Sequence, residues 1–129
     1  MWLSLMACGG LMHWIRTRIA SFRYAFSGVA QLFRHETHAQ LHLLAALLVI
    51  VAGLITGLAR WEWLALILSI ALVMAAEGLN TALEALADAL HPQHHPLIGK
   101  AKDIAAGAVL LTALASLVVA SLVFLPHWL

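Results

Sequence analysis

Charged side chains are scarce in this sequence of 129 residues. Only 10% of the residues are Asp, Glu, Lys or Arg, whereas 64% are hydrophobic. A soluble domain usually carries about 25% charged residues, so this surface suits lipid better than water, and the short length predicts one domain. Basic residues are few and the formal net charge is +1, which argues against nucleic acid as a partner. The single cysteine, Cys8, excludes a disulfide within the chain.

Long apolar stretches predict an all-α membrane protein. Three of them have the length of a transmembrane helix: residues 41–58, 61–90 and 103–125. Trp61 and Trp63 mark an interface at the start of the second stretch. Pro92 ends that stretch and Pro126 closes the third, because proline has no amide hydrogen for a helix. We therefore expect residues 1–129 to form one domain, with a loop over residues 91–100.

An amphipathic segment at residues 14–34 precedes the three spans. Its large apolar side chains recur at spacings of three and four, which is the period of a helix. They are Ile15, Ile19, Phe22, Phe26, Val29 and Phe33. We expect a surface helix that lies on an anionic leaflet. The alternative is a soluble helix packed on a partner. The apolar extension of residues 1–12 lacks the basic region of a signal peptide.

Basic residues are divided unevenly between the two ends of the spans. Those before the first and third spans are Arg16, Arg18, Arg23, Arg34, Lys100 and Lys102. Only Arg60 lies at the opposite end. Because basic loops stay in the cytoplasm, the N-terminus and the loop at 91–100 are predicted to be cytoplasmic, and the C-terminus external.

A stripe of polar residues interrupts the second span. Glu77, Asn80, Glu84 and Asp88 follow one another at spacings of three, four and four. At about 100° per residue they fall within an arc of roughly 80° on one helix face. An acid in hydrocarbon costs several kcal/mol unless it has a partner or a function, so Glu77 is a candidate functional residue.

Depth in the membrane separates two kinds of function for these acids. At about 1.5 Å per residue, Glu77 lies roughly 24 Å from Trp61, near the cytoplasmic edge of a hydrocarbon core about 30 Å thick. Glu36 just precedes the first span and Asp103 opens the third, so both reach the same boundary. A transport pathway would place its acids nearer the midplane. This boundary is instead where a lipid headgroup meets a soluble reagent.

The residue types at this boundary suit phosphoryl transfer. Separated carboxylates fit a hard cation such as Mg²⁺, Lys102 offers a charge for phosphate, and a free carboxylate can act as a general base. The sequence contains no glycine-rich nucleotide loop. Other interpretations remain open: structural ion pairs, a solvated helix end at Glu84 and Asp88, a proton- or cation-conducting protein, or a non-catalytic assembly subunit. A zinc site could use His91, His94 and His95, although no helical spacing supports it.

Two strings of residues resemble one known family. Residues 76–88, AEGLNTALEALAD, look like the E-x-x-N-[ST]-A-[IL]-E-x-x-x-D signature of the prokaryotic diacylglycerol kinase and undecaprenol kinase family. Residues 101–109, AKDIAAGAV, are similar to the A-K-D-x-A-A-G-A-V motif of the same family. The resemblance covers about Ser21 to Leu125, and residues 1–12 have no counterpart in it.

The resemblance implies a small homotrimeric lipid kinase of the bacterial inner membrane. Each protomer would have a surface helix and three spans, and neighbouring subunits would share active sites that use ATP and Mg²⁺. Glu77 matches the catalytic base, and Glu36 and Glu84 match metal ligands. The implied nucleotide contacts are Tyr24, Glu36, Glu84, Gln93, His94, His95, Lys102 and Asp103. The implied substrate contacts are Ser21, Phe22, Arg23, Tyr24, Ala25, Phe26, Glu77 and Asn80.

The segment after Glu36 bears on the choice of lipid alcohol. The undecaprenol branch tends to read E-R-N-[FM]-[RK]-[IF]-H, and residues 36–42 here read ETHAQLH. His42 is kept, whereas His38 and Gln40 depart from the pattern. The diacylglycerol branch tends to have an acid at the position of His42. The resemblance therefore favours undecaprenol as the acceptor, which would give undecaprenyl phosphate, with diacylglycerol as the alternative.

Overall fold

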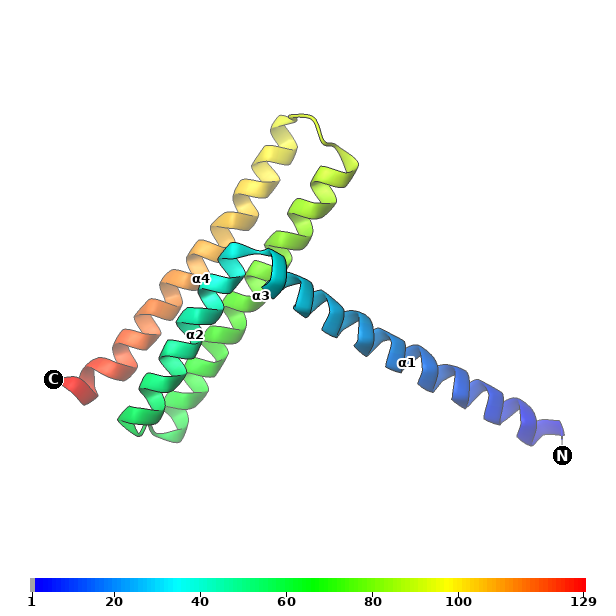
Figure 1. The fold of residues 1–129 in the computed structure, drawn as a ribbon, viewed down its shortest axis with the longest axis horizontal. Coiled ribbons are helices and arrows are strands. Elements are labelled where there is room, and N and C mark those ends of the chain that lie inside the picture. Colours follow the sequence, from blue (N-terminus) through cyan, green and yellow to red (C-terminus); the bar gives the residue numbers. More distant parts are fainter. Residues whose placement is uncertain (1) are drawn as a thin grey trace.

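Four helices build the part of the chain that the structure describes. This structure is a computed structural model that describes the backbone of residues 2–129 and the side chains of residues 10–129. The helices are α1 (Trp2–His35), α2 (Thr37–Thr56), α3 (Arg60–Leu90) and α4 (Pro96–Trp128). Helices α2, α3 and α4 run side by side, whereas α1 leaves this bundle and runs crosswise to it (Figure 1). Part of the extension at residues 1–12, namely Met1 and the side chains up to residue 9, lies outside the described residues.

The bundle confirms an all-α protein with three membrane-spanning helices. Helices α2, α3 and α4 are each long and apolar enough to cross a membrane. Large apolar side chains cover their outer surfaces, as at Ile55 and Leu79, which are 82% and 72% exposed. Such a surface needs lipid or protein around it rather than water. Helix α1 contains the predicted segment 14–34, and its place at a membrane surface stays a prediction.

A one-residue break separates α1 from α2. Glu36 has an extended backbone, with φ −102° and ψ 111°, and the chain turns sharply there. The side-chain amide of Gln40 donates to the carbonyl oxygens of Phe33 at 3.1 Å and Arg34 at 3.3 Å. These bonds satisfy carbonyls that the end of a helix leaves without partners. Gln40 therefore stabilises the elbow on which Glu36 sits.

The best-packed part of the bundle is at the turn between α2 and α3. Leu58, Leu66, Val123 and Phe124 form the buried apolar cluster of the described residues. Gly57 ends α2 in the left-handed conformation, with φ 76°, which favours glycine. From this end the α3–α4 hairpin extends beyond the start of α2 (Figure 1). The far end of the hairpin is therefore covered by fewer helices than the near end.

Polar side chains also hold this end of the bundle together. One carboxylate oxygen of Glu62 accepts a hydrogen bond from the Ala59 amide at 2.7 Å, and the other lies 2.9 Å from His127 Nε2. The indole of Trp128 donates to the Thr56 hydroxyl at 3.2 Å. The last turn of α4 is thereby fixed to both α2 and α3.

Helix α4 is longer at both ends than the sequence predicted. It begins at Pro96 rather than residue 103, so the loop shrinks from residues 91–100 to residues 91–95. Proline suits a first helical position, and the Leu97 amide donates to His95 Nδ1 at 3.2 Å, which caps the helix. Pro126 does not close the helix, which continues to Trp128. Proline lacks the amide hydrogen for one backbone bond, and beyond it the Leu129 amide donates to the Leu125 carbonyl at 3.0 Å.

The other boundaries lie closer to the predicted ones. Helix α2 runs from residue 37 to residue 56, against a predicted span of 41–58, because it begins directly after the elbow at Glu36. Helix α3 runs from residue 60 to residue 90, against a predicted span of 61–90.

Candidate active site

Helix α3 presents three residues of its polar stripe, Glu77, Asn80 and Glu84, to a cavity inside the bundle. Glu77 is buried, with 3% of its surface exposed, and its carboxylate has no hydrogen bond to any side chain of residues 10–129. The Asn80 amide donates to Glu84 Oε1 at 3.0 Å. The other end of that amide, Asn80 Oδ1, is buried without a partner. A buried carbonyl without a partner thus lies one turn of helix from a buried acid, and such a carbonyl is costly unless a ligand supplies the partner.

These side chains line a cavity of about 370 Å³ between α2, α3 and α4. Glu77, Asn80 and Glu84 form its α3 wall, and His38 and His42 face them from α2. Small and branched apolar residues of α4, including Ala106 and Val109, close the third side. The cavity therefore combines carboxylate, amide and imidazole groups with an apolar wall, so it can hold a ligand with both polar and apolar parts.

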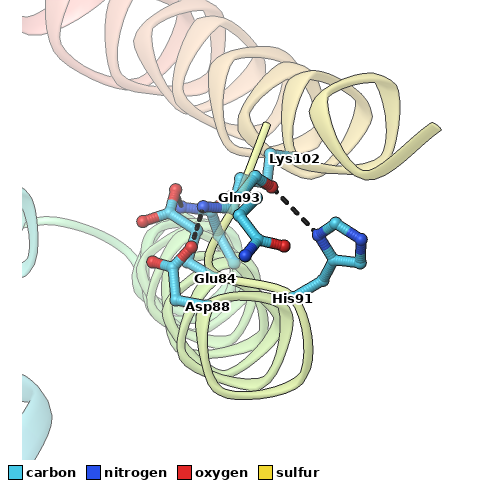
Figure 2. A network of polar contacts seen from close by, with 6 residues as sticks. Glu84, Asp88, His91, Gln93 and Lys102 are labelled. Carbon is cyan, nitrogen blue, oxygen red and sulfur yellow. Dashed lines mark hydrogen bonds and ion pairs between the residues drawn. The ribbon is translucent and has the colours of Figure 1, made fainter. Parts of the chain in front are cut away.

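A second group of polar contacts lies at the end of the hairpin. Lys102 of α4 donates to the carboxylate of Asp88 on α3, and Figure 2 shows the two side chains pointing toward one another. His91 Nδ1 lies 3.0 Å from the Gln93 carbonyl oxygen within the connecting loop, and the same view contains Glu84. The rings of His91 and His95 pack edge to face, with their centres 5.3 Å apart. The loop and the ion pair together fix the position of the ammonium group of Lys102.

Some of the predicted site residues lie away from the acid-lined cavity. Glu36 borders a different cavity, of about 590 Å³, which lies between α1 and a neighbouring face of α3. Asp103 and His94 are exposed. The predicted substrate segment from Ser21 to Phe26 lies on α1, and every residue of the segment is exposed. Within it, the guanidinium of Arg23 lies 5.7 Å from the centre of the Tyr24 ring. Glu36 and Glu84 of one chain therefore do not line a common cavity.

No ready-made metal site appears among the described residues. They contain no group of three His, Cys, Asp or Glu side chains placed to hold one ion. The zinc interpretation of His91, His94 and His95 thus has no structural support within residues 10–129. The carboxylate of Glu84 fits Mg²⁺ in its chemistry, since hard oxygen donors suit that ion, but it needs further donors to complete the coordination.

Two kinds of polar residue were absent from the predicted site. His38 and His42 both line the acid-lined cavity, and their spacing of four on α2 was the signal that they share a face. Glu62 is the second buried carboxylate of α3, with 5% of its surface exposed. Its contact with His127, 65 residues later, leaves no trace in local spacing.

Comparison with known proteins places the chain in a family. Residues 23–124 match the family described as prokaryotic diacylglycerol kinase. The chain is 40% identical over 106 residues to the undecaprenol kinase of Bacillus subtilis (strain 168), covering 82% of this chain and 86% of that one. It is also 40% identical over 109 residues to a diacylglycerol kinase of Synechocystis, covering 84% of this chain and 62% of that one.

A third relative is the diacylglycerol kinase of Haemophilus influenzae, which is 33% identical over 100 residues, covering 78% of this chain and 81% of that one. The chain belongs to the prokaryotic diacylglycerol kinase family. It is a lipid kinase with several membrane-spanning helices.

Proposed function

We propose that this lipid kinase transfers the γ-phosphoryl group of ATP to the hydroxyl of a membrane lipid alcohol, with Mg²⁺ as cofactor. The observation that carries the proposal is Glu77, which is buried, has no hydrogen bond within the described side chains, and faces a cavity. A carboxylate in that state is suited to accept a proton from a hydroxyl. Membership of a kinase family supports this over the ion-conducting and assembly alternatives.

The residues of this chain divide the proposed reaction between them. Glu77 takes the proton as the lipid oxygen bonds to the γ-phosphorus, and the bond to the bridging oxygen of ADP breaks. Asn80 holds Glu84 in position through its 3.0 Å hydrogen bond, which leaves the second carboxylate oxygen for other contacts. Mg²⁺, when bound, neutralises negative charge on the phosphates. We assign its ligands to Glu84 and to Glu36, the latter from a neighbouring subunit because the two acids of one chain line different cavities.

The proposed nucleotide contacts gather around the loop between α3 and α4. Lys102 is the cation for phosphate, and it can exchange Asp88 for a phosphate oxygen because the carboxylate is 66% exposed. Gln93, His94 and His95 form the loop beside it. Tyr24 and Asp103 complete the proposed set. The exposed segment Ser21–Phe26 would meet the lipid at the membrane surface, with Phe22 and Phe26 in the apolar layer.

The whole assembly is proposed as a homotrimer in the bacterial inner membrane with shared active sites. The loop at 91–95 and the N-terminus would lie in the cytoplasm, where ATP is available. The positive-inside distribution supports this orientation, because Arg60 alone lies at the opposite end of the bundle from the other basic residues.

Undecaprenol is the favoured acceptor and diacylglycerol the alternative. An undecaprenol kinase and a diacylglycerol kinase are both 40% identical to this chain, so sequence identity alone does not favour either lipid. His42 in the acid-lined cavity favours undecaprenol, as in the undecaprenol kinase pattern.

Radiolabelled ATP offered with each lipid to the purified protein tests both parts of the proposal. Label in undecaprenyl phosphate, above that in phosphatidic acid, is the expected result. Equal labelling would contradict the lipid preference, and no labelling of either lipid would contradict the reaction. Omission of Mg²⁺ should abolish the labelling.

A further inference from the structure

An apolar groove adjoins the acid-lined cavity. It has a volume of about 270 Å³ and lies between the same three helices, α2, α3 and α4. Val49, Val73 and Leu117 are typical of its lining. His42 and Ala113 line both the groove and the acid-lined cavity, so the two spaces meet at these residues. A ligand in the acid-lined cavity can therefore extend a hydrocarbon chain past His42 into the groove.

His42 is the polar side chain of the groove lining that is free to contact a ligand. The only other hydroxyl, amide or charged side chain in the groove lining is Ser116, whose hydroxyl donates to the Thr112 carbonyl at 2.9 Å and lies 3.4 Å from the Ser69 carbonyl. His42 is half-buried and has no hydrogen bond to any side chain of residues 10–129. A neutral imidazole has one donor and one acceptor nitrogen, so His42 can donate to a ligand oxygen at the junction.

We propose that His42 is a specificity-determining residue, which holds the hydroxyl of a single-chain lipid alcohol at this junction while the chain lies in the groove. The inference rests on the proposed kinase function and names the substrate class of the same site. The imidazole N–H would donate to one lone pair of the hydroxyl oxygen, and the hydroxyl proton would point to Glu77. A second lone pair stays free to attack phosphorus, so the contact fixes the nucleophile without blocking it.

The small volume of the groove and its lining favour one chain over two. Lipid tails are as apolar as the groove lining, so the groove gains little by burying a chain and selects by fit instead. A diacylglycerol brings a second chain and two ester carbonyls. Apart from His42, the groove lining offers no free donor for those carbonyls. We therefore expect a diacylglycerol to stay outside the groove and to present its hydroxyl without a contact to His42. A polyprenol has one chain and no other polar group, so it leaves nothing unsatisfied.

Two substitutions of His42 and one control substitution elsewhere test the role of its imidazole. His42→Leu keeps the bulk of the side chain without the donor, His42→Gln restores an N–H donor, and His13→Leu is the control on the exposed face of α1. The purified full-length variants are assayed with ATP, Mg²⁺ and either undecaprenol or diacylglycerol. We expect His42→Leu to raise KM for undecaprenol about three- to tenfold, the scale of one lost hydrogen bond, with little change in kcat. KM for diacylglycerol should stay constant, and His42→Gln should recover most of the loss.

A second pair of variants tests the groove without touching any polar group. Ala113→Phe fills the junction, whereas Ala115→Phe places the same ring on the exposed face of α4. Only Ala113→Phe should raise KM for undecaprenol. If His42→Leu leaves KM for undecaprenol unchanged, or raises KM for both lipids equally, the assignment of His42 is wrong although the kinase proposal stands.

Lipid binding without ATP separates this inference from the kinase proposal. Undecaprenol added without nucleotide should raise the melting temperature of the wild type more than that of His42→Leu. Equal shifts would overturn the inference. If the wild type labels neither lipid and yet shows the larger shift, the kinase proposal fails and the binding role of His42 remains.

Discussion

Glu77 carries the sharpest prediction at the scale of single residues. It is 3% exposed and lacks a hydrogen bond among the described side chains, so Glu77→Gln removes the proton acceptor with almost no change of shape. We expect kcat to fall by a factor of about 10² or more, the usual scale for loss of general acid–base catalysis. The measurement is transfer of label from ATP to purified lipid.

The other buried acid of α3 supplies a control for this substitution. Glu62 is 5% exposed and lies near the opposite end of the same helix. Glu62→Gln should keep kcat near the wild-type value, although it weakens the contact with His127. A Glu77→Gln variant with near-normal kcat would show that Glu77 is not the base.

Asn80 is expected to act on metal affinity through Glu84. Its amide holds Glu84 Oε1 at 3.0 Å, so Asn80→Ala leaves that carboxylate free to rotate. Loss of a residue that orients a metal ligand typically weakens metal binding by about 10- to 100-fold. We expect the Mg²⁺ concentration for half-maximal rate to rise within that range, in a Mg²⁺ titration of kinase activity.

Ser69 supplies the control for the Asn80 experiment, because this polar residue of α3 lines neither the acid-lined cavity nor the cavity at Glu36. Ser69→Ala should leave the Mg²⁺ titration unchanged. An unchanged titration for Asn80→Ala would mean that Glu84 needs no such support or does not bind the metal.

At the scale of elements, the contact of Lys102 with Asp88 joins α3 to α4 across a short loop. The two side chains are 31% and 66% exposed, and ion pairs so accessible to water contribute about 1 kcal/mol or less to stability. We therefore expect Asp88→Asn to change the melting temperature little. Lys102→Met should raise KM for ATP, since the ammonium group is the proposed phosphate contact, whereas Asp88→Asn should not. Equal KM values for all three proteins would remove Lys102 from the nucleotide site.

The opposite end of the bundle depends on a contact between distant parts of the chain. Glu62 joins His127 and the Ala59 amide, and these bonds fix the end of α4 against the turn between α2 and α3. His127→Ala leaves the buried Glu62 with one partner fewer, so we expect the melting temperature of the detergent-solubilised protein to fall by several degrees. The kcat of this variant should remain near wild type, because the site lies at the other end. His127→Gln, which can still donate to Glu62, should recover part of the loss.

The elements show which features of the fold can be predicted from sequence. The polar stripe of α3 depends on spacings of three and four within one helix, which are local, and the structure places Glu77, Asn80 and Glu84 in one cavity. The ends of α4 depend on the caps around two prolines. Pro96 can begin a helix and Pro126 can sit in its last turn, and the rule that proline ends helices missed both. The pairing of Glu62 with His127 comes from packing between elements, so no spacing predicted it.

At the scale of the whole molecule, one chain presents an incomplete site. Glu84 lines the cavity between α2, α3 and α4, and Glu36 lines the cavity between α1 and a neighbouring face of α3. Within residues 10–129, no three acidic, histidine or cysteine side chains lie close enough to hold one ion. The broad apolar surfaces of the bundle are available for contact with further copies, as at Leu79, which is 72% exposed. A second copy can therefore supply the acid that the first lacks.

Mixed assemblies of two inactive variants test whether subunits share active sites. Glu36→Gln and Glu84→Gln should each abolish activity alone, because each removes one proposed metal ligand. If each site takes Glu36 from one subunit and Glu84 from its neighbour, some sites of a mixed oligomer contain both intact acids. Co-expression of the two variants should then restore a measurable fraction of wild-type kcat, whereas a mixture of separately purified variants that do not exchange subunits should stay inactive. Because Glu77 and Glu84 of one chain line the same cavity, co-expression of Glu77→Gln with Glu36→Gln should also restore activity, whereas co-expression of Glu77→Gln with Glu84→Gln should not. No recovery in the first mixture, together with copurification of the two variants, would show that each chain supplies both acids to its own site.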